Sequence, residues 1–267
     1  MTDDASHAAS VEAWRRQRYA ALRREIGWLT LAGLDWLRAG VNTVGTDAAA
    51  DITLPEGPLA AGTVTLADGR AVAEGEIAGG AAIPMVSDAD GEPTMLELGS
   101  LRMCLIRRGE RLALRTWHTE APQRRTFAGI DHYPVDAAWR IHGRLERAGD
   151  RTIRVPDVLG EVSDEASPGS VLFTVDGREL RIDALEGGPR GELWLVFGDA
   201  TNGLTTYGGG RFLYTAAPAA DGTVWVDFNR AYNPPCVFSA YATCPLPPPQ
   251  NRLSIAIEAG EKAYKVR

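Results

Sequence analysis

The sequence predicts a mostly β protein, in which an N-terminal helix precedes a β-sandwich or barrel-like body. Turn-forming residues are abundant, with 29 glycines and 16 prolines in 267 residues, which favours many short strands over long helices. From Trp28 onward, strand-length runs end at Gly, Pro or Asp about every ten residues, a spacing typical of sandwiches and barrels. Apolar residues at helical spacing occur near the start of the chain, which predicts the helix there.

The predicted helix covers residues 11–26, where apolar side chains recur at helical spacing. Ser10 is a suitable N-cap in front of it, and Gly27 follows its last turn. We therefore expect residues 1–10 to form a disordered tail before the helix.

The rest of the chain is predicted to form strands. LRMCLI and RLALRTW flank Arg108-Gly109-Glu110 and predict a β-hairpin. AAWRIHGRLE and RTIRVPDV are interpreted as two separate strands, and TVWVDF and LSIAIE as two more. The expected organisation is a tail and helix over residues 1–27, an N-terminal β subdomain over 28–120 and a C-terminal β subdomain over 121–267 that carries the candidate site. A single two-sheet body is the alternative.

The composition argues against several classes of function. The net charge is -7 and the pI is about 5.2, whereas a protein that binds nucleic acid needs clustered positive charge. The N-terminal MTDDASHAAS is no secretion signal, and no apolar run approaches the roughly 18 residues of a membrane span. We therefore expect a soluble cytoplasmic protein that binds neither nucleic acid nor membrane and keeps its three cysteines reduced.

The last part of the chain differs in texture from the rest. Residues 199–262 contain a long stretch rich in Tyr, Asn, Pro and Cys between the predicted strands TVWVDF and LSIAIE. A loop of this length in a compact domain is commonly functional, and its aromatic and apolar content argues against disorder. We therefore place the candidate functional surface in residues 199–262.

Four strings in this region carry a family resemblance. YGGGRF, DFNRAYNPPC, ATCPLPPPQNRL and IEAGEK occur in this order, and GWLTLAGLDWL, FAGIDHYPVD and SPGSVLFTVDG precede them. Together they resemble the bacterial domain-of-unknown-function family numbered sixteen eighty-four, over nearly the whole chain from Trp28. The resemblance implies that these segments belong together in one type of protein, and it implies no activity.

Two motifs in residues 199–262 indicate a pocket for a small polar or anionic molecule. The glycines of YGGGR allow backbone N–H groups to converge on an anion that Arg211 clamps, with a flexible turn as the alternative. On a strand over residues 223–229, Asp227 and Asn229 project from the same face. Either they bind a ligand, or they satisfy backbone groups of the loop that follows.

Cys236 and Cys244 are eight positions apart in the same segment. The favoured interpretation is that they are small buried residues beside prolines. A zinc site has no further ligands at suitable spacing, a nucleophilic cysteine has no nearby histidine in the sequence, and a disulfide on oxidation is a third alternative.

The candidate catalytic residues are Asp227 and Glu258, and the candidate ligand-binding residues are Tyr207, Arg211, Asn229, Tyr232, Asn251 and Arg252. In this hypothesis a carboxylate acts as acid or base, the arginines hold an anion and the tyrosines form the walls of the pocket. No metal or cofactor is expected, and the oligomeric state stays open. Two alternatives use the same residues: a binding module without chemistry, and a scaffold in which the polar loop only closes a barrel.

Overall fold

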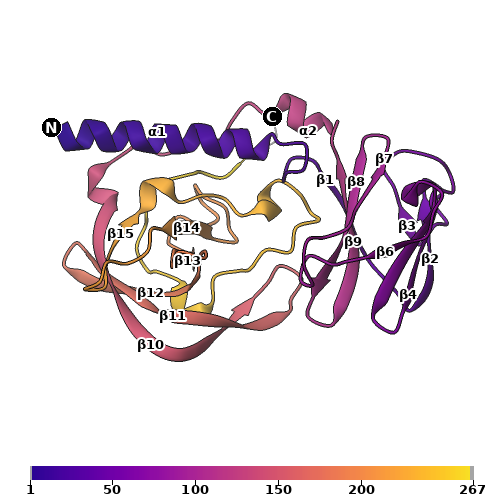
Figure 1. The fold of residues 1–267 in the computed structure, drawn as a ribbon. Coiled ribbons are helices and arrows are strands. Elements are labelled where there is room, and N and C mark those ends of the chain that lie inside the picture. The colour runs from indigo at the N-terminus through magenta and orange to yellow at the C-terminus, as the bar shows by residue number, and fades with distance from the viewer. Residues whose placement is uncertain (1, 265–267) are drawn as a thin grey trace. The chain divides into compact units, whose positions relative to one another are not determined.

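The computed structural model of the protein describes residues 2–264 and shows a mostly β fold with one long N-terminal helix (Figure 1). The predicted fold class is confirmed. The helices are α1 (Thr2–Leu22) and α2 (Pro122–Thr126), with 3₁₀ helices at Glu76–Ala78, Ala137–Trp139, Phe228–Arg230, Pro235–Val237 and Pro249–Asn251. The strands are β1 (Leu31–Trp36), β2 (Gly40–Gly45), β3 (Ile52–Thr53), β4 (Gly62–Ala67), β5 (Arg70–Gly75), β6 (Ile83–Met85), β7 (Met95–Leu98), β8 (Leu101–Arg108), β9 (Arg111–His118), β10 (Arg140–Pro156), β11 (Val162–Val175), β12 (Arg178–Glu186), β13 (Leu193–Phe197), β14 (Arg211–Thr215) and β15 (Thr223–Asp227).

The described residues form two compact units. Unit 1 consists of residues 2–19, 128–238 and 243–264, and unit 2 consists of residues 20–127 and 239–242. Unit 1 therefore contains most of α1 and the strands from β10 onward, whereas unit 2 contains β1 to β9. Nearly all of the segment that the sequence singled out belongs to unit 1.

Helix α1 begins earlier than the sequence predicted. It already starts at Thr2, so the expected disordered tail over residues 1–10 is wrong for the described part of that segment. His7 is buried, and its Nε2 lies 2.9 Å from Asp227 Oδ2. This contact with a residue 220 positions away helps to hold the first turns of α1 in place, and local sequence does not reveal it. Within residues 2–264, no helix has both the length and the apolar character needed to cross a bilayer.

Unit 2 contains two sheets, with strand orders β1-β9-β8-β7 and β3-β2-β4-β5-β6. Strands β8 and β9 pair antiparallel from Leu101 opposite His118 to Arg108 opposite Arg111, which confirms the predicted hairpin. Buried side chains of both sheets, such as Val64 and Leu105, belong to one apolar core.

Unit 1 is built around a curled half-barrel sheet with the strand order β14-β13-β12-β11-β10-β15, in which neighbours pair antiparallel (Figure 1). The interpretation of AAWRIHGRLE and RTIRVPDV as separate strands is wrong, because β10 runs through both as one strand of 17 residues. Its register against β11 shifts between Arg147 and Arg151, and this irregularity interrupts the pairing without ending the strand.

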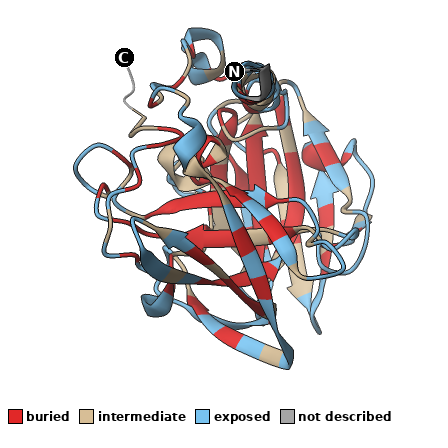
Figure 2. Ribbon diagram, turned by 90° about the vertical axis from the view of Figure 1, so that its left-hand side faces the viewer, coloured by how far each residue is buried: buried red, intermediate tan, exposed pale blue. Residues whose placement is uncertain are grey.

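The core of unit 1 follows the alternation expected of half-buried strands (Figure 2). In β15, Val224 and Val226 are buried whereas Trp225 between them is 42% exposed. The predicted core positions Val224, Val226 and Phe228 all belong to the apolar cluster of this unit.

At the C-terminal end, the predicted strand TVWVDF is found as β15, whereas the predicted strand LSIAIE is absent. Strand β15 ends at Asp227 rather than at Asn229, because the Asp227 side chain accepts the Asn229 N–H and starts a 3₁₀ helix. Residues 253–258 form no strand, and they make single hydrogen bonds with a neighbouring segment instead. One of these joins Leu253 N to Gly198 O at 2.8 Å.

Candidate functional site

The predicted anion clamp, Arg211, lies inside the protein. It begins β14, and both its side chain and that of its ion-pair partner Asp199 are fully buried. Arg211 Nη2 donates to Asp199 Oδ2 at 2.8 Å and to the Ile257 carbonyl oxygen at 2.9 Å. Arg211 Nη1 donates to the Ala259 carbonyl oxygen. The guanidinium thus holds the C-terminal segment, residues 252–262, in place.

The glycines in front of Arg211 allow close packing. Gly210 has a φ of 88°, and a Cβ there would lie 2.3 Å from Pro247 Cγ. A Cβ on Gly209 would lie 2.4 Å from Cε1 of Tyr207. At Gly210 the positive φ and the approach of Pro247 both require glycine, whereas at Gly209 a Cβ would displace the Tyr207 ring.

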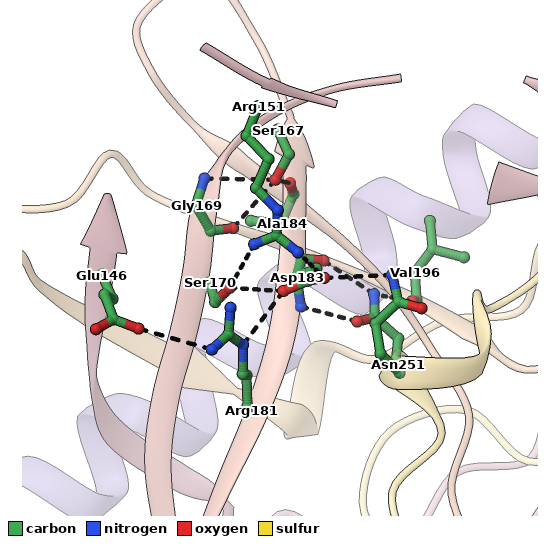
Figure 3. A network of polar contacts seen from close by, with 11 residues as sticks. Glu146, Arg151, Ser167, Gly169, Ser170, Arg181, Asp183, Ala184, Val196 and Asn251 are labelled. Carbon is green, nitrogen blue, oxygen red and sulfur yellow. Dashed lines mark hydrogen bonds and ion pairs between the residues drawn. The ribbon is translucent and has the colours of Figure 1, made fainter. Parts of the chain in front are cut away.

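Asn251 belongs to a buried hydrogen-bond network rather than to an open pocket (Figure 3). Its Oδ1 accepts the Asp183 N–H at 2.8 Å. Its Nδ2 donates to the carbonyl oxygens of Asp183 and Val196, each at 2.9 Å. One side chain therefore satisfies three main-chain groups and attaches the loop before the C-terminal segment to β12 and β13.

Asp183 is the centre of this network (Figure 3). Its carboxylate accepts from Ser170 Oγ at 2.6 Å, Arg151 Nη2 at 2.5 Å and Gln250 Nε2 at 3.2 Å. Burial raises the pKa of Asp183, but the donors from Ser170 and Arg151 outweigh it, and the net pKa lies below the ordinary value. The ionised carboxylate is thus stabilised inside the sheet by its neighbours.

Asp227 and Asn229 act as connectors at the end of β15. Asp227 Oδ2 lies 2.9 Å from His7 Nε2 and 3.2 Å from Arg230 Nε. Asn229 is fully buried, and its amide exchanges two hydrogen bonds with the main chain of Asp136, at 2.8 and 2.9 Å. These contacts are those expected if Asp227 and Asn229 pair with main-chain polar groups and anchor the loop that follows β15.

Tyr232 lies in an aromatic stack. Its ring is nearly parallel to that of Tyr214, with centroids 6.2 Å apart, and the Arg18 guanidinium lies 4.5 Å from its centroid. Burial raises the pKa of Tyr232, so it stays protonated. Arg18 Nε also donates to Glu261 at 2.8 Å, and Glu261 is fully buried.

Glu258 and Arg252, the remaining candidates in the C-terminal segment, are exposed. Seven of the eight candidate residues are therefore divided among buried networks, an aromatic stack and the surface, and Tyr207 lies in a separate cluster. Within residues 2–264, the structure does not bring them together as one set.

Tyr207 belongs to a different cluster, together with Cys236 and Cys244. The Cys236 N–H donates to Cys244 Sγ at 3.1 Å, and Cys236 Sγ lies 3.5 Å from the Tyr207 hydroxyl oxygen. Cys244 is 3% exposed, whereas Cys236 and Tyr207 are partly exposed. We call these three residues the thiol cluster.

The environment of the thiol cluster favours a thiolate. The hydrogen bond from Cys244, helped by the Tyr207 hydroxyl and opposed by burial, lowers the pKa of Cys236 to about 7. Burial and the neighbouring Cys236 raise the pKa of Tyr207, which therefore remains a hydrogen-bond donor. In contrast, burial raises the pKa of Cys104 in unit 2 to about 11.

Sequence reasoning named Tyr207 as a pocket wall and weighed the cysteines without placing them together. The signal was present, because the chain has three cysteines and two of them lie in the segment already singled out. The spacing of eight residues does not reveal that the loop brings Cys244 back into contact with Cys236. No group of three or more His, Cys, Asp or Glu side chains suited to a metal ion occurs within the described part of the chain.

The thiol cluster lies within a region that matches a known family. The model of the protein of unknown function DUF1684 matches residues 125–262, which is more than half of the chain. The chain belongs to the DUF1684 family. The DUF1684 region includes β10 to β15 and all three residues of the thiol cluster, and it confirms the family resemblance predicted from the sequence strings.

The other comparisons assign no function to this DUF1684 protein. A search of curated proteins finds no match. Among solved structures, an uncharacterised protein of Haloarcula marismortui determined by solution NMR is 27% identical, over 52% of this chain and 79% of that chain, with a TM-score of 0.44.

Proposed function

We propose that this DUF1684 protein is an enzyme that acts on a small polar molecule through the thiol of Cys236. The observation that carries the proposal is the contact of Cys236 with the Tyr207 hydroxyl on one side and Cys244 on the other. This arrangement keeps a polar hydrogen-bond donor beside a partly exposed sulfur. Partial exposure is typical of reactive cysteines, whereas structural cysteines are buried in apolar surroundings.

The chemistry follows from the two protonation states in the cluster. At neutral pH a large share of Cys236 is thiolate, because its pKa is about 7, and a thiolate is a strong nucleophile. The raised pKa of Tyr207 keeps its hydroxyl protonated, so it is able to donate a hydrogen bond or a proton to oxygen on the reacting molecule. Cys236 is thus the proposed nucleophile and Tyr207 the proposed proton donor.

The proposed site lies in the expected segment, residues 199–262, but the reacting residues are Cys236 and Tyr207 instead of Asp227 and Glu258. A negative charge on the substrate is no longer required, because the buried Arg211 already pairs with Asp199 and donates to two carbonyl oxygens. Asp227 and Asn229 are engaged with the chain itself. The proposal includes a reducing, cytoplasmic location, where free thiols persist.

The test measures the alkylation of each cysteine by iodoacetamide as a function of pH, with peptide mass spectrometry as the readout. At pH 7, Cys236 carries about fifty times more thiolate than a thiol with a pKa of 9. A thiolate of lower pKa is less nucleophilic, so we expect a rate about fivefold above that of an ordinary thiol. Half of the maximal rate is expected near pH 7.

Variants and an internal control make this test specific. Tyr207→Phe and Cys244→Ala each remove one hydrogen bond to the thiolate, so each is expected to move the inflection of Cys236 toward higher pH. Cys104 in the same chain is the control, because its raised pKa predicts no appreciable alkylation at neutral pH. An inflection of Cys236 near pH 9 in the parent protein would refute the proposal.

A scaffold role is the second candidate, and one observation favours it. Arg211, Asn229 and Asn251 are buried, and each bonds to main-chain groups of distant segments. In a pure scaffold, Cys236 reacts as an ordinary thiol, and substitutions in the segment lower stability without affecting any reaction. The alkylation profile therefore separates the two candidates.

A further inference from the structure

We propose that Cys236 and Cys244 form a peroxide-reactive dithiol, which a hydroperoxide converts to an intramolecular disulfide and an external dithiol restores. The inference rests on the proposed function, because it requires Cys236 to be the reactive thiol. It adds the class of small polar molecule, a hydroperoxide, and a role for Cys244.

The two cysteines are already in contact in the reduced protein. Both are free, and the Cys236 N–H donates to Cys244 Sγ at 3.1 Å. A disulfide requires the Cα atoms to be within about 7 Å. Because the main chain of Cys236 touches the sulfur of Cys244, the bond requires little movement of either residue.

Each cysteine is held by its own surroundings within unit 1. Cys236 is the middle residue of the 3₁₀ helix Pro235–Val237, whose last N–H donates to the Pro234 carbonyl oxygen at 3.1 Å. The Cys244 carbonyl oxygen accepts the Val158 N–H at 3.0 Å. The contact between the Cys236 main chain and the Cys244 sulfur is therefore set by two separately fixed segments, and such preorganisation favours rapid disulfide formation.

Exposure assigns the order of the two thiols. Cys244 is 3% exposed, whereas Cys236 is partly exposed and lies beside the Tyr207 hydroxyl. A dissolved oxidant therefore meets Cys236 first. Cys244, buried behind it, is positioned to attack the sulfur of Cys236 in the second step.

The oxidation balances in two steps. The Cys236 thiolate attacks the terminal oxygen of a hydroperoxide ROOH, so an S–O bond forms, the O–O bond breaks and the alkoxide leaves as ROH after protonation. Cys244 then attacks the sulfenic acid sulfur, so an S–S bond forms, the S–O bond breaks and water leaves. The sum is two thiols and ROOH giving a disulfide, ROH and water; with hydrogen peroxide, ROH is a second water.

The return step needs a reductant, and a dithiol supplies it. One thiolate of the external dithiol attacks the disulfide and forms a mixed disulfide, and its second thiol releases the reduced protein while the external dithiol becomes a disulfide. Two electrons pass from the external dithiol to the cysteine pair.

The experiment treats the full reduced chain with one equivalent of hydrogen peroxide at neutral pH. Remaining thiols are alkylated, and peptides are mapped by mass spectrometry without reduction. We expect a Cys236–Cys244 crosslink that dithiothreitol reverses. Cys104→Ser is the matched control and is expected to leave the crosslink unchanged, because Cys104 lies in unit 2 and is buried.

Variants of the thiol cluster test the assigned roles. Cys244→Ser is expected to abolish the crosslink and leave a sulfenic acid on Cys236 that dimedone traps. Tyr207→Phe is expected to slow oxidation about twofold at neutral pH, because fewer Cys236 thiols are ionised while the remaining thiolate is more nucleophilic. If Cys244→Ser folds poorly, Cys236→Ser provides a second test, in which Cys244 is expected to remain reduced under the same treatment.

The outcomes separate this inference from the proposed function. If Cys236 alkylates with an inflection near pH 7 but peroxide yields no crosslink in the parent protein, the inference is overturned and the thiol site stands. If Cys236 alkylates as an ordinary thiol, both fail. A crosslink only between two chains, visible as a dimer in non-reducing electrophoresis, also overturns the inference.

Discussion

Replacing Arg211 by methionine removes the charge from one member of a fully buried ion pair and leaves Asp199 without its partner. The same substitution also deprives the carbonyl oxygens of Ile257 and Ala259 of their donors. Loss of one member of a buried pair costs about 3–5 kcal/mol. Because domains are stable by about 5–15 kcal/mol, this is a large fraction of the total.

The assay is urea unfolding at neutral pH, followed by far-ultraviolet circular dichroism, with thermal unfolding beside it. We expect the midpoint to fall with little change in slope, and the melting temperature to fall by about 10 °C. Arg252→Met is the matched control, because it makes the same substitution on an exposed arginine of the C-terminal segment. Its effect is expected within about 0.5 kcal/mol of zero.

The interpretation of Arg211 as a structural residue would be refuted if Arg211→Met were no less stable than Arg252→Met. A ligand that loses its affinity in a fully stable Arg211→Met protein would restore the anion-clamp hypothesis. The comparison of stabilities is measurable without knowledge of any ligand.

Three further predictions concern stability. Asn251→Leu is expected to cost about 3 kcal/mol in urea unfolding, because three buried main-chain groups lose their partner, whereas Gln250→Ala removes one contact and should cost about 1 kcal/mol or less. The pKa of Asp183 is lowered by folding, so the stability that its charge contributes is complete above about pH 4 and is lost as the pH falls further. The difference in stability between the parent and Asp183→Asn should therefore shrink in acid. A difference that grows in acid would contradict this assignment. Gly210→Ala should destabilise by more than about 2 kcal/mol because its Cβ would overlap a proline ring, whereas Gly203→Ala, also at positive φ but with open space around it, should cost about 1 kcal/mol in the same thermal assay.

Local patterns in the sequence predicted much of the fold. The alternation of Val224, Trp225 and Val226 predicted which side chains enter the core, since neighbouring side chains on a strand point to opposite faces. The hairpin between β8 and β9 followed from apolar runs on either side of Arg108-Gly109-Glu110. These features depend on residues that are close in the chain.

The surroundings of the polar residues depend on distant contacts, and the sequence did not reveal them. Arg211 bonds to carbonyl groups 46 and 48 positions away, and the start of α1 is joined to Asp227 by His7 across 220 positions. From the sequence alone, an arginine in such a polar segment fits a ligand-binding site and a buried structural ion pair equally well. Only the folded arrangement shows that Arg211 is already paired and that Cys236 meets Cys244.

The most direct test is a titration of thiolate by its ultraviolet absorbance in the folded parent protein and in Cys236→Ser. The raised pKa of Cys104 keeps its thiol protonated at neutral pH, so signal there comes from the pair in unit 1. We predict a rise in absorbance centred near pH 7 that disappears in Cys236→Ser. Absorbance that stays flat until about pH 9, or an unchanged rise in Cys236→Ser, would contradict a reactive thiol at this position.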